Sequence, residues 1–232
     1  MGRATALELA RAGVIVWSIA RRGRELDELA RGARPGRIEP LVADLTDGAR
    51  LAEVCERIAG QGVALDLLIH AAGRYDRHDI EALGDDELRQ VLHLNVEVVH
   101  DLTRRLLPSL KRARGHVIFL NSSLGVRAGR GVAAYSSSKH ALRAYADALR
   151  EEVNPDGVRV TTVYLGRTAT PMQENVHRME RRPYRPERLV QPEDVAGLIR
   201  TIVELPPTTE VIDVALRPTL PIPAPRRGQA AP

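Results

Sequence analysis

Hydrophobic and polar positions repeat along the chain with two different spacings. Some segments place apolar residues three or four positions apart, as on one face of a helix, and others are short apolar runs typical of buried strands. Helices are expected at residues 3–12, 23–32, 47–59, 85–107, 135–153 and 192–204, and strands at 14–19, 38–43, 65–70, 116–120, 158–164 and 211–216. Since helical crossovers separate the strands, the sequence predicts an α/β fold: a doubly wound, Rossmann-like parallel sheet with helices on both faces.

Two segments lack either spacing. Residues 168–190 are irregular, rich in Arg and Pro, and follow the carboxyl end of a predicted strand, so we expect a mobile, lid-like loop there. Residues 217–232 contain five prolines and are expected to form a disordered tail. The length of 232 residues suits one α/β domain with a sizeable core, which we place at residues 1–216.

The composition indicates which cell compartment and which classes of partner are expected. Cys55 is the single cysteine, which excludes an internal disulfide framework and fits a cytoplasmic protein in a reducing environment. No apolar run approaches the roughly 20 residues of a membrane span, so no membrane partner is expected. The formal charge is only +4, and aromatic residues make up 3% of the chain. Because stacking residues are scarce, a nucleic-acid partner is disfavoured.

One lysine stands out because this chain places arginine almost everywhere else. Of 34 basic residues only Lys111 and Lys139 are lysines, and Lys139 follows Tyr135 by four positions. On a helix this spacing puts both side chains on one face. An ammonium beside a phenol stabilises the phenolate and is expected to lower its pKa from about 10 toward working pH, so that Tyr135 can exchange a proton. The alternative is an accidental pair on a solvated helix.

Ser122 strengthens the first interpretation. It follows the predicted strand at 116–120, and ligand crevices of open α/β sheets lie outside the carboxyl ends of the strands. A substrate carbonyl could meet the Ser122 hydroxyl there. The alternative is a polar strand end that caps the next loop.

With these motifs in order, the chain resembles the short-chain dehydrogenase/reductase family from about residue 2 to residue 216. Ser122, Tyr135 and Lys139 match the family's catalytic triplet, and Asn95 matches its catalytic asparagine. Three further segments resemble family motifs: the adenine-contacting pair Asp44-Leu45, the strand end His70-Ala71-Ala72-Gly73, and the nicotinamide segment from Gly166 to Met172 that includes Thr168 and Thr170. For Asn95 alone, a helix-interior residue bonding a local carbonyl is the alternative.

The resemblance implies hydride transfer between a nicotinamide cofactor and a small-molecule carbonyl or alcohol, with no metal ion. Tyr135 would supply the proton, and Ser122 would hydrogen-bond the carbonyl oxygen as negative charge develops there. Lys139 would hold the nicotinamide ribose, and Asn95 would anchor a water that links Lys139 to solvent. The resemblance also implies a homodimer or homotetramer built through the helices at 85–107 and 135–153.

The end of the strand at 14–19 indicates the cofactor. NAD-dependent enzymes place an acid at this point to bind the ribose 2′-OH, whereas this chain has Ala20-Arg21-Arg22. Arg21 can clamp a 2′-phosphate, and Arg3 can add to the same site, so NADP(H) is favoured over NAD(H). The alternative is that these are solvated arginines in an Arg-rich chain. The complete set of residues expected at the cofactor is Gly2, Arg3, Arg21, Arg22, Asp44, Leu45, Ala72, Gly73, Tyr135, Lys139, Gly166, Thr168 and Thr170.

The chain departs from the family at its start. Family members open with a central strand and the turn Thr-Gly-x-x-x-Gly-Ile-Gly, of which only Gly2 is present, so the first central strand is expected to be absent. Losing about six buried apolar residues costs on the order of 10 kcal/mol. Either the natural protein is longer, which we favour, or the chain is a non-catalytic or cofactor-poor relative with a binding or regulatory role. The 232-residue form is expected to bind NADP(H) poorly.

The sequence does not identify the substrate. Arginines crowd the expected lid-like loop, where they either attract an anionic substrate or form a solvated surface. They are Arg178, Arg181, Arg182, Arg185 and Arg188.

Overall fold

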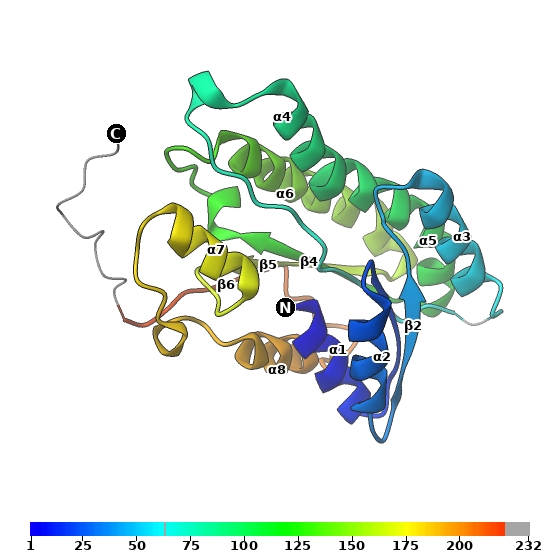
Figure 1. The fold of residues 1–232 in the computed structure, drawn as a ribbon. Helices are drawn as coiled ribbons and strands as arrows, with labels where there is room; N and C mark the ends of the chain where they lie inside the picture. Colours follow the sequence, from blue (N-terminus) through cyan, green and yellow to red (C-terminus); the bar gives the residue numbers. More distant parts are fainter. Residues whose placement is uncertain (63, 221–232) are drawn as a thin grey trace.

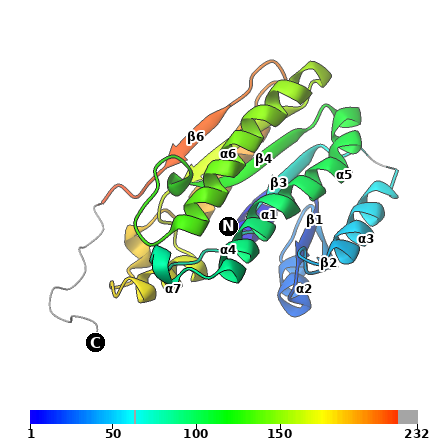
Figure 2. The same cartoon turned by 90° about the horizontal axis from the view of Figure 1, so that it is seen from above.

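Parallel strands form the framework of the molecule, in two separate hydrogen-bonded sheets. The computed structural model describes residues 1–62 and 64–220. The smaller sheet pairs β1 (Ile15–Ala20) with β2 (Arg37–Val42). The larger one has the order β3-β4-β5-β6, formed by β3 (Leu67–His70), β4 (His116–Ser122), β5 (Arg159–Leu165) and β6 (Asp213–Leu216). All pairings are parallel, which confirms the predicted α/β architecture (Figure 2).

Helices cover both faces of this framework (Figure 1). One face carries α1 (Gly2–Arg11), α2 (Gly23–Arg31) and α8 (Pro192–Val203). The other face carries α3 (Gly48–Ala59), α5 (Val98–Ala113) and α6 (Ala133–Val153), and α4 (Asp85–Leu92) runs into α5 through a π-helical turn, His93–Glu97. α7 (Pro171–Met179) follows the carboxyl end of β5.

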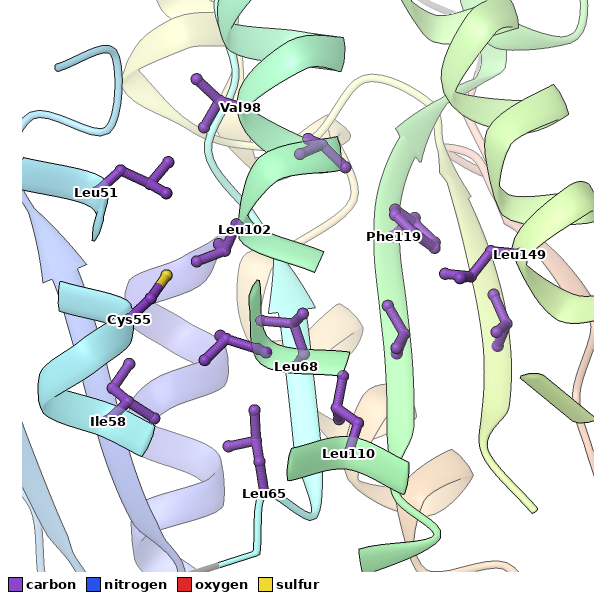
Figure 3. Packing of buried hydrophobic residues seen from close by; sticks show 14 of the residues in the cluster. Leu51, Cys55, Ile58, Leu65, Leu68, Val98, Leu102, Leu110, Phe119 and Leu149 are labelled. Atoms are coloured by element: carbon purple, nitrogen blue, oxygen red, sulfur yellow. The ribbon is translucent and has the colours of Figure 1, made fainter. Parts of the chain in front are cut away.

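The core is divided by the sheet, because successive strand residues point to opposite faces. Val117 and Phe119 of β4 pack into the cluster formed with α3, α5 and α6, which Figure 3 shows from close by. Ile118 and Leu120 point the other way, into a second cluster with α8. Every residue of β4 is buried, as expected for a central strand covered on both faces.

The sheet is interrupted between β1 and β3. Among the described residues these two strands share no ladder, and β1 has no fully buried residue, with Ile15 48% exposed. The first central strand, expected from the sequence to be absent, would lie at this position. Helix packing spans the interruption instead, with α1 against α8 on one face and α3 against α5 on the other.

Two predicted segments need correction. The single helix expected at 85–107 is α4, the π turn and α5, which continues past Pro108 to Ala113. The segment 168–190, expected to be irregular, contains α7, which the Thr170 hydroxyl caps by accepting a hydrogen bond from Gln173 N, with Pro171 at the first helical position. Residues 217–220 of the expected tail have no helix or strand, and 221–232 lie outside the described residues.

Candidate active site

Ser122, Tyr135 and Lys139 meet at the carboxyl end of β4. Ser122 is the last residue of this strand, and Tyr135 and Lys139 project from the first two turns of α6. All three are buried, with exposed fractions of 8%, 9% and 4%. The Tyr135 hydroxyl interacts with Ser122. Lys139 Nζ donates to the Leu120 carbonyl at 3.0 Å and lies 5.8 Å from the centroid of the Tyr135 ring. The structure therefore brings the predicted triplet together.

Burial sets the proton affinities at this site. It raises the pKa of Tyr135 to about 12, and hydrogen bonding to Ser122 opposes the shift. It also lowers the pKa of Lys139 to about 8. The expectation that Lys139 lowers the pKa of Tyr135 is wrong in this structure, because removal of the phenol from water outweighs a charge that is itself turned toward the Leu120 carbonyl. At neutral pH Tyr135 is a protonated phenol.

Asn95 ties the loop after β3 to α6. Its side chain lies in the π-helical turn and is 1% exposed. Asn95 Oδ1 accepts from Arg74 N at 2.8 Å, and Nδ2 donates to Arg74 O and to Ser138 Oγ, both at 2.9 Å. Ser138 Oγ in turn donates to the Tyr135 carbonyl at 2.7 Å. The alternative of a purely local hydrogen bond is wrong, because the partners lie 21 and 43 positions away.

Asn121 is a positioning residue that the sequence did not indicate. Its Nδ2 donates to the Lys139 carbonyl at 3.1 Å, and its Oδ1 accepts from Ser122 N at 2.7 Å. Gly125 completes this contact, because a Cβ added there would lie 2.6 Å from Asn121 Oδ1 and 2.8 Å from Lys139 O. The available signal was an amide residue at a strand end just before the candidate serine.

Tyr75 was also missed. Its ring centroid lies 4.9 Å from that of Tyr135, with the planes tilted by 58°. Burial raises the pKa of Tyr75, and hydrogen bonding to Arg77 opposes the shift. Tyr75 lies in a segment without regular spacing, so no pattern in the sequence pointed to it.

The residues after the end of β3 leave open space beside the triplet of Ser122, Tyr135 and Lys139. Ala72 is exposed and Gly73 is half-buried. A Cβ on Gly73 would lie 3.4 Å from Asn95 Oδ1 and 4.0 Å from Lys139 Nζ, so a larger side chain would fill the space beside the lysine. His70 below them is structural: its Nε2 pairs with Thr103 Oγ1 at 2.8 Å, and burial lowers its pKa to about 3.

The residues predicted at the adenosine side lie at the ends of β1 and β2. Arg21 and Arg22 are exposed, but Arg22 pairs with Glu25 at 2.7 Å. Asp44 accepts hydrogen bonds from Thr46 N at 3.0 Å and Thr46 Oγ1 at 2.7 Å. These bonds lower the pKa of Asp44, and the positive charge of Arg21 adds to the shift.

Leu45, Gly2 and Arg3 complete this side. Leu45 is half-buried against the core. Gly2 begins α1 beside the end of β3, because its added Cβ would lie 3.2 Å from Ala71 Cβ. Arg3 is exposed.

The residues after β5 contact the end of β6 and one another. Gly166 N donates to Leu216 O of β6 at 2.7 Å, and an added Cβ would lie 3.0 Å from that oxygen. Thr168 Oγ1 donates to Gly166 O at 3.2 Å, and Thr170 Oγ1 donates to Thr168 O at 3.3 Å besides capping α7. These threonines shape the turn from β5 into α7.

All predicted site residues therefore lie along one edge of the framework, where parallel strands end and ligand crevices form. Within residues 1–62 and 64–220, no three His, Cys, Asp or Glu side chains are grouped to hold a metal ion. In the same residues, no helix combines the length and apolar character needed to cross a membrane.

Comparison with known proteins places the chain in a family. The sequence model of the short chain dehydrogenases matches residues 1–181. An uncharacterized short-chain type dehydrogenase/reductase of Sinorhizobium fredii is 33% identical over 224 residues, which cover 94% of this chain and 87% of the relative.

Solved structures agree on the fold. An alcohol dehydrogenase from the archaeon Thermococcus sibiricus, complexed with 5-hydroxy-NADP, superimposes with a TM-score of 0.85 at 24% identity, covering 95% of this chain and 93% of the other. A NAD+-bound xylitol dehydrogenase superimposes with a TM-score of 0.84 at 17% identity, covering 94% and 93%. With the matched sequence model and the relative, these findings show that the chain belongs to the short-chain dehydrogenase/reductase family of oxidoreductases.

Proposed function

We propose that the protein is an NADP(H)-dependent oxidoreductase that interconverts a small-molecule carbonyl and alcohol, with Tyr135 as the proton donor or acceptor. The observation that carries this proposal is the buried Tyr135 hydroxyl beside Ser122 at the carboxyl end of β4. A phenol and a hydroxyl that meet here can both hydrogen-bond one carbonyl oxygen.

The described residues suit a nicotinamide cofactor on the ribose side. Gly73 leaves space next to the buried Lys139 Nζ, where hydroxyl groups of a ribose can accept its hydrogen bonds. Ala72 and Gly73 would line one side of the cofactor site, and Lys139 would hold the nicotinamide ribose. When bound, the reduced cofactor supplies the hydride.

Each polar side chain of the site has a distinct part in this proposal. Ser122 donates a hydrogen bond to the carbonyl oxygen and so stabilises the negative charge that develops there. Tyr135 carries a proton at neutral pH, because burial raises its pKa to about 12, and it gives this proton to the same oxygen. Asn95 and Asn121 are positioning residues, since they fix α6 against the loop after β3 and the end of β4.

NADP(H) is favoured over NAD(H) on the chemistry at the end of β1. Arg21 is exposed at the end of β1, so its guanidinium can bind a 2′-phosphate through charge-assisted hydrogen bonds. Arg22 is a weaker candidate because Glu25 already pairs with it.

The test of the reaction measures consumption of NADPH with a panel of aldehydes and ketones. Tyr135→Phe should lower kcat at least about 100-fold, because it removes the proton that the reaction needs. Tyr145→Phe is the matched control: Tyr145 lies on the same helix and contacts His100 instead. Equal activity of the two variants would refute the assignment.

The test of the cofactor compares NADPH with NADH. Arg21→Ala should lower kcat/KM for NADPH about 10-fold or more and leave that for NADH nearly unchanged. Arg24→Ala is the control, since Arg24 is exposed and paired with Glu28. A wild-type preference for NADH would overturn this part of the proposal alone.

A second candidate is a non-catalytic, cofactor-poor binding protein with the same fold. The interruption between β1 and β3 favours it, because dinucleotides bind across the centre of such sheets. Calorimetry with NADPH decides between the two: saturable binding supports the enzyme, and no binding together with no turnover supports the second candidate.

A further inference from the structure

We propose that a cluster of arginines next to Tyr75 binds an anionic group of the substrate, a carboxylate or a phosphate. The inference names a substrate class and therefore rests on the proposed carbonyl chemistry. The cluster consists of Arg77, Arg167 and Arg182, which surround Glu180 at the end of α7. We call it the Glu180 cluster.

One carboxylate holds three guanidinium groups in this cluster. Glu180 Oε2 accepts from Arg167 Nη2 at 2.6 Å and pairs with Arg182 Nε at 3.2 Å, and Oε1 accepts from Arg77 Nη1 at 3.5 Å. The arginines come from three separate segments: the loop after β3, the turn after β5 and the chain after α7. Glu180 thus fixes the positions of charges that lie far apart in the sequence.

The charges in the cluster do not balance. Even without Arg182, the guanidinium groups of Arg77 and Arg167 and the carboxylate of Glu180 carry a formal net charge of +1. The nearby carboxylate of Asp76 is engaged elsewhere, with Arg74 at 3.6 Å and His78 at 3.0 Å. The arginine side chains are 24–32% exposed and that of Glu180 is 11% exposed, so the excess positive charge is only partly hydrated. Partly desolvated charges of one sign attract a counter-ion strongly.

Arg167 supplies unused binding capacity. Its Nη1 is buried and, within the described part of the chain, has no hydrogen-bond partner. An unmet donor on a charged group is costly, and the guanidinium fork matches two oxygens of a carboxylate or phosphate. An anion that displaces the neighbouring side chains slightly would satisfy this donor and neutralise the cluster.

The Glu180 cluster adjoins the proposed reaction centre. Tyr75 packs against Tyr135 with ring centroids 4.9 Å apart, and Arg77 hydrogen-bonds Tyr75. Arg167 directly follows Gly166 at the end of β5, on the same edge of the sheet as Ser122. A substrate whose carbonyl lies at Ser122 and Tyr135 can therefore reach the cluster with an acidic substituent.

A purely structural role is the competing account. In that case Glu180 anchors α7 to the loop after β3, and the surplus arginines take no part in binding. The two accounts differ in one measurable respect, the discrimination between an acidic substrate and its uncharged counterpart.

The experiment uses benzaldehydes that share one ring and one aldehyde group and differ in the para substituent, which is anionic or uncharged. 4-Carboxybenzaldehyde is compared with its methyl ester, and 4-formylphenyl phosphate provides the phosphate arm. We expect the wild-type protein to reduce at least one acid with a kcat/KM about 10-fold above that of the ester, and this ratio to fall as salt screens the cluster. The better acid identifies carboxylate or phosphate as the preferred group.

Variants of Arg167 connect this ratio to the cluster. Arg167→Gln should bring the acid-to-ester ratio close to one, and Arg167→Lys should retain part of it, because the charge remains without the fork. Arg178→Gln is the control, since Arg178 is an exposed arginine on α7 outside the cluster, and it should retain the wild-type ratio. No wild-type preference, or an equal loss for acid and ester in Arg167→Gln, would overturn the inference and leave the proposed reaction intact.

Absence of turnover with every aldehyde would instead count against the proposed reaction. Calorimetry then tests anion binding at the Glu180 cluster without the need for turnover. Saturable binding of 4-carboxybenzaldehyde or 4-formylphenyl phosphate that weakens about 10-fold in Arg167→Gln supports the anion site, and no binding of either probe overturns it.

Discussion

Asn95 and Ser138 lie 43 positions apart in the sequence, and Asn95 Nδ2 donates a 2.9 Å hydrogen bond to Ser138 Oγ. Ser138 Oγ also donates to the carbonyl of Tyr135 at 2.7 Å. One hydroxyl thus serves both as acceptor for the π-helical turn and as donor within the helix that carries the phenol. The position of Tyr135 therefore depends on Ser138, which is not one of the three residues of the triplet.

Ser138→Ala should therefore destabilise the protein and disturb the site. It leaves a buried amide donor of Asn95 without this partner, which costs about 1–3 kcal/mol. We expect a lower urea midpoint and a lower kcat with the fastest aldehyde of the panel. Ser137→Ala is the matched control, because Ser137 is exposed on the same helix. Indistinguishable midpoints for the two variants would contradict the role of Ser138.

Gly125→Ala should be more damaging than its size suggests. The added methyl group would lie 2.6 Å from Asn121 Oδ1 and 2.8 Å from Lys139 O, so the contact between β4 and α6 must open. Gly197→Ala is the opposite case, because no heavy atom lies within 4 Å of its added Cβ in the middle of α8. This second change should stabilise the protein by up to about 1 kcal/mol. Thermal unfolding of both variants checks the prediction, and equal shifts in Tm would contradict it.

Lys139 should make stability depend on pH in alkaline solution. Burial lowers its pKa from 10.5 to about 8, so between these values the unfolded chain binds more protons than the folded one. Stability from this group therefore rises as pH increases from about 8 toward 10.5.

Lys139→Met removes this titration. Its gain in unfolding free energy relative to the wild type should be largest at pH 7 and should shrink as the wild-type lysine loses its charge. The comparison isolates this group, because Tyr135 and Cys55, whose pKa values are raised from 10.0 and 9.0, titrate in both proteins and cancel from the difference. Urea titrations at several pH values measure the difference, and parallel curves for the two proteins would count against a lysine with a lowered pKa.

Ile15→Lys should reduce aggregation without unfolding the protein. Ile15 is 48% exposed at the start of β1, whose only ladder partner among the described residues is β2. Exposed strand edges promote association, and a lysine opposes it. Light scattering on heating should show later aggregation at a similar Tm. Ile38→Lys on β2 is the contrasting variant, since Ile38 is 4% exposed and its replacement should unfold the protein.

Regular spacing made most of the fold predictable. Each strand and helix with clear periodicity was found, whereas α7 was missed because it lies in the Arg- and Pro-rich segment 168–190, although Thr170-Pro171 is a recognisable helix start. At the site, the sequence predicted that Tyr135 and Lys139 share a helix face. It could not show Tyr75 packing against Tyr135, since no local pattern joins residues 60 positions apart. Nor could it show the raised pKa of Tyr135, because desolvation depends on residues brought together only by folding.

The interruption between β1 and β3 divides the framework into two sheets. The two-stranded sheet carries Arg21 and Asp44, the four-stranded sheet carries Ser122, and no ladder in the described residues joins them. Side-chain packing of α1 on α8 and of α3 on α5 connects the two sheets. Packed helices slide past one another by small shear motions more readily than a hydrogen-bonded ladder deforms. Any ligand long enough to contact both sheets would therefore fix the distance between the two ends of the site.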